Sequence, residues 1–571
     1  MTPPAHTLPP ATRDVRPAAV RLGPTTWLVV WHVLVWTLLQ ALAQGNLDSY
    51  HDMLENFAWA QTFEWGHFKH PPFFAWVVGA WFQLFPTTDW AYRLLAYTNV
   101  ALGLWGVATL ARRLGLAVHA PGAVLLLLWA LPYTTLAAKF NANSQLLSLW
   151  PWTAVALLAA VGSRGWRGGA WHLALGLLAA ASLLSKYYSG VFLAGFLVVA
   201  LTRADGRRWV LSPWPWLALG VFVAALWPHL AWLRNSGFAT LGYAMDQGGG
   251  DTAWRALFKF ALTPLIYWGL PWLASVAVYA AATGASASGT PPRWPARLLR
   301  GLWVSWRPQG WDDSLFWLAV LPGGVTLLFG LAGAVELSTP WAIPIGYAFS
   351  LLWLRNLSTD AGPGTARQLR ARLLRAAWPA LALVVLVGVA HGAHRASQGH
   401  PDHYRPAQQT AHEVLALWAR EAPGLPLGWA GGAWADNALM AFYGDRHIRA
   451  LPGLPDAAPA TLAPHPDWAS QGGVLLCPLG PTGAERPALP PGEEASAAPV
   501  PSTRYNKDPE QCLADMAAWL RQQGQPDAPV RLRVAREGWR FPRQVPFDYA
   551  VFLYRPTLKP QAAGGLTPAG R

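Results

Sequence analysis

The chain has 571 residues, of which 53% are hydrophobic and 13% are charged, whereas an ordinary soluble protein has about 25% charged residues. This composition excludes a disordered protein and a plain cytosolic enzyme, and the 2 cysteines are too few for a disulfide-stapled secreted domain. The formal charge of +14 also occurs in nucleic-acid-binding proteins, so its placement along the chain must be considered before it is interpreted.

Residues 1–24 are rich in proline, and we expect a disordered N-terminus there. From Thr25 to about Ala393, apolar runs recur that are long enough to cross about 30 Å of hydrocarbon. They predict a polytopic α-helical membrane protein with about eleven spans, at 25–45, 90–111, 117–138, 143–163, 170–185, 188–202, 213–232, 260–282, 314–333, 337–354 and 376–393. Ala41-Leu42-Ala43 resembles a signal-peptide cleavage site, but the preceding stretch is long, and we expect an uncleaved anchor.

The positive charge falls on one side of the predicted membrane. One set of loops carries 19 basic and five acidic residues, whereas the opposite loops carry seven and eight, and the tail carries 17 and 16. The positive-inside rule therefore predicts a cytoplasmic N-terminus, with the acidic loops and the C-terminal tail outside. The charge is thus a topology signal and gives no indication of nucleic acid.

The first outer loop, residues 46–89, carries a run of acids. If 47–61 is helical, Asp48, Asp52 and Glu55 lie on one face, at i, i+4 and i+7. Beside them runs an apolar stripe, which predicts a helix along the membrane surface with this stripe in the lipid: Leu47, Tyr50, Leu54, Phe57 and Ala58. Neighbouring carboxylates raise one another's pKa, so the arrangement favours a base held over a substrate. The alternative is a solvated acidic face.

The second half of this loop turns sharply. Pro71 disfavours helix at His70, so the chain must turn there and present Lys69. The alternative role for Lys69 is an interface anchor whose stem lies along apolar surface. The following apolar segment, 73–85, is too short to span the membrane, and we expect it to be interfacial.

Residues 396–571 differ in character and predict a small α/β domain outside the membrane. A helix is expected at 408–420, and strands at 473–478, 530–535 and 549–554. The stretch 451–501 is rich in proline, alanine and glycine and is expected to be mostly loop. Cys477 and Cys512 both fall in this domain, and their spacing leaves open a disulfide or two free buried thiols.

The first outer loop resembles a known family. Asp52, then Trp65-Gly66, then Lys69-His70-Pro71-Pro72, just after the first span, is similar to the lipid-sugar-dependent glycosyltransferases of the GT-C class. The nearest branch is the bacterial family 39-like proteins, relatives of the protein O-mannosyltransferases and of the lipid A aminoarabinose transferase. Further stretches fit the same branch, although each one alone is a weak signal: Phe140-Asn141-Ala142-Asn143, Trp150-Pro151-Trp152, Ser185-Lys186-Tyr187-Tyr188, Pro228-His229-Leu230 with Trp232, and Trp341-Ala342-Ile343-Pro344.

The resemblance covers residues 25–395 and implies a GT-C-like transmembrane catalytic domain. It implies a polyprenyl-phosphate-linked sugar as donor, attack by an acceptor hydroxyl or phosphate, inversion, and an oxocarbenium-like transition state. The family position of the general base corresponds to Asp52. Many members carry Glu directly after it where this chain has Met53, so the second acid is Glu55 or is missing.

Phosphate departure requires fixed positive charge. The resemblance implies this role for Lys69. The position of Lys186 at the outer end of the fifth predicted span, and that of Arg255 on an outer loop, make these two residues further candidates for binding the phosphate. Lys139, Arg234 and Lys259, also on outer loops, are weaker candidates. Candidate substrate-binding residues are Asp48, Tyr50, His70, Asn143 and His229. Structural alternatives remain for several of them: a helix cap for Asp48, a solvated charge for Glu55, an interface anchor for Lys186, a hydrogen-bonded interfacial histidine for His229, and a plain outer turn for Asn143.

We expect no cofactor beyond the lipid-linked donor and no bound metal. Asp52 and Glu55 could hold a divalent ion, but lysines at the leaving group make one less necessary. The expected partners are a polyprenyl-phosphate sugar, an acceptor (glycolipid, polysaccharide or protein) and the bilayer of a bacterial inner membrane. Competing readings are a transporter or flippase for lipid-linked sugars and a non-catalytic scaffold. The sequence identifies neither the sugar nor the acceptor.

Overall fold

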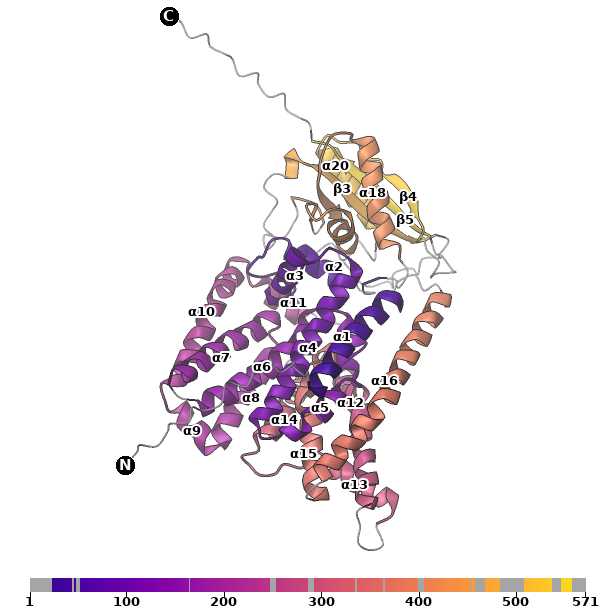
Figure 1. The fold of residues 1–571 in the computed structure, drawn as a ribbon. Helices are drawn as coiled ribbons and strands as arrows, with labels where there is room; N and C mark the ends of the chain where they lie inside the picture. Colours follow the sequence, from indigo (N-terminus) through magenta and orange to yellow (C-terminus); the bar gives the residue numbers. More distant parts are fainter. Residues whose placement is uncertain are drawn as a thin grey trace, which may run out of the picture.

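The computed structural model describes residues 23–43, 46–47, 52–163, 165–246, 253–285, 292–333, 336–362, 365–398, 405–451, 453–456, 468–482, 508–536 and 546–556. Two of the predicted substrate-binding residues, Asp48 and Tyr50, lie outside these ranges. A bundle of helices forms the larger part of the molecule, and a sheet with its own helices sits on one end of the bundle (Figure 1).

The part before residue 399 is helical. Its α-helices are α1 (Pro24–Ala43), α2 (Asp52–Ala60), α3 (Phe73–Leu84), α4 (Asp89–Arg113), α5 (Ala120–Leu127), α6 (Ala142–Gly162), α7 (Gly165–Ser185), α8 (Ser189–Thr202), α9 (Ala204–Val210), α10 (Trp214–Asn235), α11 (Ala239–Asp246), α12 (Ala253–Ala285), α13 (Trp294–Val304), α14 (Ser314–Leu331), α15 (Phe349–Ala361) and α16 (Thr365–Gln398).

Eight of these helices, within the described residues, are long and apolar enough to cross a membrane: α1, α4, α6, α7, α10, α12, α14 and α16. Two bent pairs raise the number to as many as ten, namely 117–127 with 131–138 (84°) and α8 with α9 (113°). Helix α3 is apolar but short, as predicted for 73–85.

The tenth predicted span, 337–354, is not one continuous helix. Two short 3₁₀ helices, Thr339–Ala342 and Ile345–Ala348, precede α15. Pro340 and Pro344 lie in or next to them, and proline removes a backbone donor and clashes with the preceding turn. The sequence pattern detected the apolar run correctly but missed this break.

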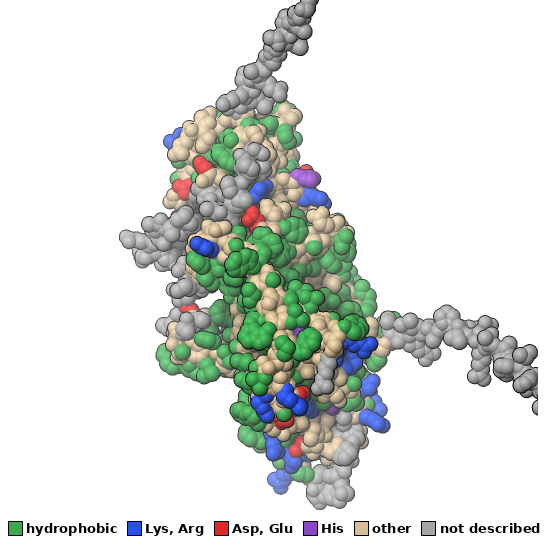
Figure 2. Space-filling view, turned by 90° about the vertical axis from the view of Figure 1, so that its left-hand side faces the viewer, with side chains coloured by type: hydrophobic (Ala, Val, Ile, Leu, Met, Phe, Trp, Pro, Cys, Tyr) green, Lys and Arg blue, Asp and Glu red, His purple; other side chains and the backbone are tan. Residues whose placement is uncertain are grey.

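The surface of the bundle suits a bilayer. Large apolar side chains such as Trp227 on α10, Leu265 on α12 and Leu386 on α16 are exposed, and an exposed apolar surface of this extent indicates a membrane or a partner. Hydrophobic side chains cover the middle of the molecule, and Lys and Arg gather at the end away from the C-terminal sheet (Figure 2). We call this the arginine end.

The C-terminal part is a small α/β unit. It contains α18 (Ala407–Glu421), β1 (Leu427–Gly432), α19 (Trp434–Leu439), β2 (Arg449–Ala450), β3 (Gly472–Pro481), α20 (Pro509–Gln522), β4 (Val530–Val534) and β5 (Phe547–Tyr554). The strand order is β2-β1-β3-β5-β4. Strand β1 is parallel to β2 and β3, whereas β5 is antiparallel to β3 and β4.

The structure confirms the predicted helix at 408–420 and the three predicted strands, which are β3, β4 and β5. Cys477 on β3 and Cys512 on α20 form a disulfide, with their Cα atoms 5.8 Å apart, so the free-thiol alternative was wrong. Strand β1 was missed because its sequence, Leu-Gly-Trp-Ala-Gly-Gly, is poor in the β-branched residues that mark strands.

The first outer loop packs against the C-terminal part. Met53, Leu54 and Phe57 of α2 share one core with α3 and with residues of α18, α19 and β5. The Phe57 ring meets the Phe442 ring edge-on, with centroids 5.1 Å apart. The prediction that the apolar stripe of this helix lies in lipid was therefore wrong, because protein covers it. The described helix also begins only at Asp52.

Candidate active site

Asp52 is the first residue of α2. Its Oδ2 accepts from Lys139 Nζ at 2.6 Å and from Asn141 Nδ2 at 3.4 Å. The Asp52 side chain is 35% exposed to solvent. A carboxylate that is fixed by a lysine and still reachable can act as a base towards an incoming hydroxyl.

The segment 139–141 is held against α2 by further contacts. Asn56 Nδ2 donates to the Phe140 carbonyl at 2.7 Å. Asn141 then caps α6, because its side chain accepts from the backbone N–H groups of Asn143 and Ser144 at 3.0 and 3.1 Å. This capping box and the Asn56 bond fix the position of Lys139 next to Asp52.

Glu55 lies one turn further along α2 and is buried. Its Oε1 accepts from Lys69 Nζ at 2.6 Å and from the Trp434 indole at 2.5 Å. Burial raises the pKa of Glu55, the Lys69 charge opposes this, and the Asp52 charge adds to it. Because both donors occupy one oxygen and the side chain is covered, Glu55 is suited to holding Lys69 in place.

The charges of Lys69 and Lys186 both influence the pKa of the His70 side chain. Burial lowers the pKa of His70 well below its usual value, and the charges of Lys186 and Lys69 lower it further. Burial also lowers the pKa of Lys186 to about 8, against the opposing attraction of Asp52. The Lys186 ammonium lies 5.8 Å from the centre of the Trp341 ring. Lys69 thus lies against the helix that carries the predicted base, and the charge of Lys186 interacts with both His70 and Asp52.

His229 fastens the first outer loop to α10. Its Nδ1 lies 2.6 Å from the Trp65 carbonyl oxygen, and its Nε2 lies 2.8 Å from the Tyr187 hydroxyl. The neighbouring Gly66 approaches the Trp232 ring so closely that an added Cβ would lie 2.3 Å from it. With both ring nitrogens engaged, His229 has the geometry of the hydrogen-bonded alternative, and it positions the loop.

The remaining predicted residues are less closely joined to this cluster. Asn143 is buried on the first turn of α6, and its Oδ1 has no hydrogen-bond partner among the described residues. Arg255 lies on the first turn of α12 with an exposed side chain. The two ion pairs of the cluster, Lys139–Asp52 and Lys69–Glu55, do not include it.

Sequence reasoning ranked one contact too low and missed another. Lys139 was a weaker candidate, although it forms the ion pair with Asp52. The contact of Trp434 with Glu55 cannot be predicted from the sequence, because 379 residues separate the two and no local pattern signals such a contact. Within the ranges that the structure describes, no group of three or more His, Cys, Asp or Glu side chains is placed to hold a metal ion.

A hollow of about 210 Å³ lies beside the other end of α2. Its walls include the aromatic rings of Phe57, Phe63 and Phe82, with Arg446 and His447 from the C-terminal part. Gln61 at the end of α2 donates to the Arg446 and Ile448 carbonyls at 3.1 and 2.9 Å. The hollow is therefore a seam between the first outer loop and the C-terminal part.

Residues 69–232 match the family model described as dolichyl-phosphate-mannose-protein mannosyltransferase. This segment of the chain is therefore similar to that mannosyltransferase family. The matched segment contains Lys69, His70, Lys186 and His229, whereas Asp52 lies before it. No curated protein sequence matches the chain.

Two solved structures are also similar to this chain. ArnT from Cupriavidus metallidurans bound to undecaprenyl phosphate is 15% identical, with 92% of this chain and 98% of that chain covered and a TM-score of 0.47. The Archaeoglobus fulgidus oligosaccharyltransferase in complex with Zn and sulfate is 13% identical, with 74% and 62% covered and a TM-score of 0.39.

Proposed function

We propose that the protein transfers a sugar from a polyprenyl-phosphate donor to a hydroxyl or phosphate acceptor on the outer face of a bacterial inner membrane. The observation that carries this proposal is the reachable Asp52 carboxylate, fixed by Lys139, with the Lys69–Glu55 ion pair one turn further along the same helix. A base and a cation at one membrane-bound site are what transfer from a lipid phosphate requires.

In the proposed reaction the acceptor O–H gives its proton to Asp52. The acceptor oxygen forms a bond to the anomeric carbon, and the bond between that carbon and the phosphate oxygen breaks. The electron pair leaves with the polyprenyl phosphate. Because the acceptor attacks the face opposite this leaving group in a single displacement, the configuration at the anomeric carbon inverts. Lys186 and Lys69 stabilise the charge that grows on the leaving phosphate, and Glu55 keeps Lys69 in position through their 2.6 Å ion pair.

We further propose that the N-terminus is cytoplasmic. A separate proposal concerns the C-terminal part, with boundaries near 396–571, which helps to admit the acceptor. Support comes from the seam at Gln61, Phe63 and Arg446, where the C-terminal part meets the loop that carries Asp52. An Arg446→Ala variant should raise the KM for the acceptor and leave the KM for the donor unchanged. An unchanged acceptor KM would contradict this role.

Mass spectrometry of envelope lipids and glycoproteins tests the proposed function. Cells with the wild-type gene, a deletion and Asp52→Asn are compared. We expect one acceptor to lose its sugar in both mutants while the polyprenyl-phosphate sugar accumulates, which also identifies both substrates. If the deletion alters the profile and an Asp52→Asn protein at normal abundance restores it, Asp52 is not the base and transport of a lipid-linked sugar becomes the better account.

A further inference from the structure

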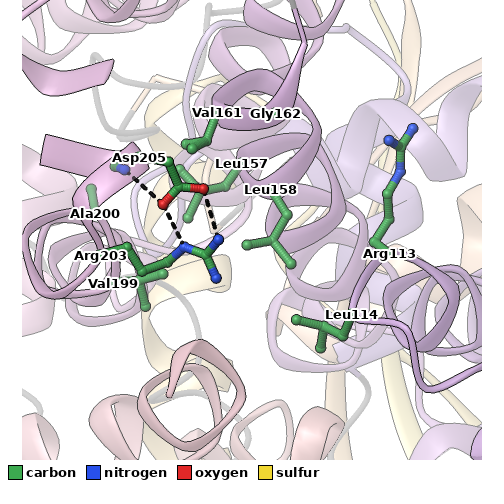
Figure 3. A pocket seen from close by; sticks show the side chains of 11 residues that line it. Arg113, Leu114, Leu157, Leu158, Val161, Gly162, Val199, Ala200, Arg203 and Asp205 are labelled. Atoms are coloured by element: carbon green, nitrogen blue, oxygen red, sulfur yellow. Dashed lines mark hydrogen bonds and ion pairs between the residues drawn. The ribbon is translucent and has the colours of Figure 1, made fainter. Parts of the chain in front are cut away.

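A second hollow, of about 350 Å³, opens at the arginine end of the bundle. It lies between the ends of α4, α6 and α8 and the start of α9 (Figure 3). Helix α6 begins beside Asp52 and has its last residues in the wall of this hollow. Its 21 residues span about 30 Å, so the hollow is separate from the candidate active site.

The sharp turn between α8 and α9 shapes one side of the hollow. The two helices meet at 113°, and Arg203 at the corner binds Asp205 through two hydrogen bonds of 2.9 and 2.7 Å. Gly206 packs so tightly there that an added Cβ would lie 2.3 Å from the Ala200 carbonyl oxygen. The corner is therefore a fixed part of the fold.

The lining combines charge with apolar walls. Arg113 stands across the hollow from the Arg203–Asp205 pair, with the Leu157 and Leu158 side chains between them (Figure 3). The Arg113 guanidinium lies 5.0 Å from the centre of the Trp171 ring. The charged residues of the lining are thus two arginines, Arg113 and Arg203, and a single acid, Asp205.

An amphiphile matches this lining better than water does. Water gains few hydrogen bonds along walls made of leucine and valine, whereas an acyl chain packs well there. An arginine-rich rim at the membrane surface attracts phosphate, and basic pockets between membrane helices bind anionic headgroups. We propose that this hollow binds the headgroup phosphate of an anionic phospholipid, with an acyl chain along Leu158 and Val161.

The chain offers a matched pair of arginines for a test. Arg113 lines the hollow, whereas its neighbour Arg112 donates from Nη2 to Thr109 Oγ1 at 2.8 Å and is not part of the lining. Gly162 also lines the hollow, and an added Cβ there meets no atom within 4 Å. Gly162→Leu therefore fills space without changing charge.

Native mass spectrometry of the full chain in detergent measures lipid binding. The probes are dioleoyl phosphatidylglycerol, dioleoyl phosphatidylethanolamine and undecaprenyl phosphate. We expect wild-type protein to prefer phosphatidylglycerol to phosphatidylethanolamine. Arg113→Gln and Gly162→Leu should each weaken phosphatidylglycerol binding about tenfold, as expected for the loss of one charged hydrogen bond or of the space, and Arg112→Gln should bind as wild type does.

Three results would overturn the proposal. Equal weakening by Arg112→Gln and Arg113→Gln would indicate general charge attraction. Unchanged binding by Gly162→Leu would place the lipid elsewhere. Stronger competition by undecaprenyl phosphate than by phosphatidylglycerol at this hollow would make the carrier lipid its occupant. None of these results depends on sugar transfer, so this experiment tests the lipid-binding proposal independently of the proposed function.

Discussion

The Lys186 ammonium has a pKa of about 8 because burial disfavours its charged form. A bound phosphate would stabilise the charge and raise this pKa, so donor binding takes up a proton once the pH exceeds about 8. We therefore predict that donor affinity is constant below pH 8 and weakens as the pH rises from 8 towards 10. Titration of donor binding between pH 6.5 and 10 checks this.

Lys186→Arg supplies the control, because arginine keeps its charge throughout this range. Its affinity should stay level above pH 8, even if the absolute value differs from that of the wild type. A wild-type profile as flat as that of the arginine variant would remove Lys186 from the donor phosphate site.

His67 predicts a different pH dependence. Its ring stacks on Trp59 with centroids 5.0 Å apart, and neither ring nitrogen has a hydrogen-bond partner among the described residues. Burial lowers its pKa to about 3, whereas the unfolded value is about 6.5. The unfolded chain therefore takes up the proton first. Stability is complete above pH 6.5 and falls as the pH drops, by at most about 1.4 kcal/mol per pH unit for this group.

His67→Phe keeps an aromatic ring against Trp59 and removes the titrating group. Thermal unfolding between pH 7 and pH 5 should show a smaller loss of Tm for this variant than for the wild type. Identical Tm profiles would mean that His67 is not the buried neutral group described here.

At the scale of elements, α19 and α2 are coupled through the Trp434 indole and Glu55. Trp434→Phe removes one donor to a buried carboxylate, which costs about 1.5–3 kcal/mol of folding free energy. Because Glu55 also binds Lys69, we expect the donor KM to rise about tenfold. Steady-state kinetics with a fixed acceptor concentration measures this effect.

The matched control is Trp519→Phe. Trp519 also donates its indole N–H to a carboxylate, that of Asp456, at 2.8 Å, but within the C-terminal part. This variant should lose stability without a change in donor KM. Equal KM effects in both variants would show that general destabilisation, not the Glu55 contact, causes the change.

The disulfide gives a prediction for the C-terminal part alone. Cys477 and Cys512 are 35 residues apart, and closing a loop of this length stabilises a fold by about 4 kcal/mol. Cys477→Ala with Cys512→Ala should lower the Tm of the C-terminal part, as should reduction of the wild type. Equal melting of the oxidised and reduced proteins would contradict this.

The sequence predicted elements well wherever their signal is local. Ten apolar runs gave helices or bent helix pairs of spanning character, because a membrane requires long apolar segments. The break at 339–348 and the short strand β1 depend on proline geometry and on packing in a Gly-rich segment, which hydropathy does not register. The burial of α2 was not predictable either, because the C-terminal part that covers it lies more than 340 residues away.

The candidate active site likewise combines residues that local motifs predict with contacts that only the fold creates. One loop motif predicts Asp52 and Lys69 as site residues, and the position of Lys186 at the outer end of a helix predicts it as a third. Their mutual arrangement depends on Asn56 binding Phe140 and on His229 holding Trp65. These contacts join segments 84 and 164 residues apart, so no spacing rule could supply them.

At the scale of the whole molecule, the two ends of the bundle have different chemistry. The end with α2, α3 and the C-terminal part carries the candidate active site, and the opposite end carries the arginines (Figures 1 and 2). This polarity fits a protein that works on one side of a membrane and receives a substrate whose lipid tail stays in the bilayer.

The most direct test of the central claim is the turnover of purified, reconstituted protein with a polyprenyl-phosphate sugar and its acceptor, followed as released polyprenyl phosphate. Asp52→Asn should lower kcat about 10²–10⁴-fold with an unchanged Tm. The matched surface variant Asp527→Asn, which disrupts only an exposed ion pair with Arg521, should be as active as the wild type. Release of polyprenyl phosphate by Asp52→Asn at the wild-type rate would contradict the account.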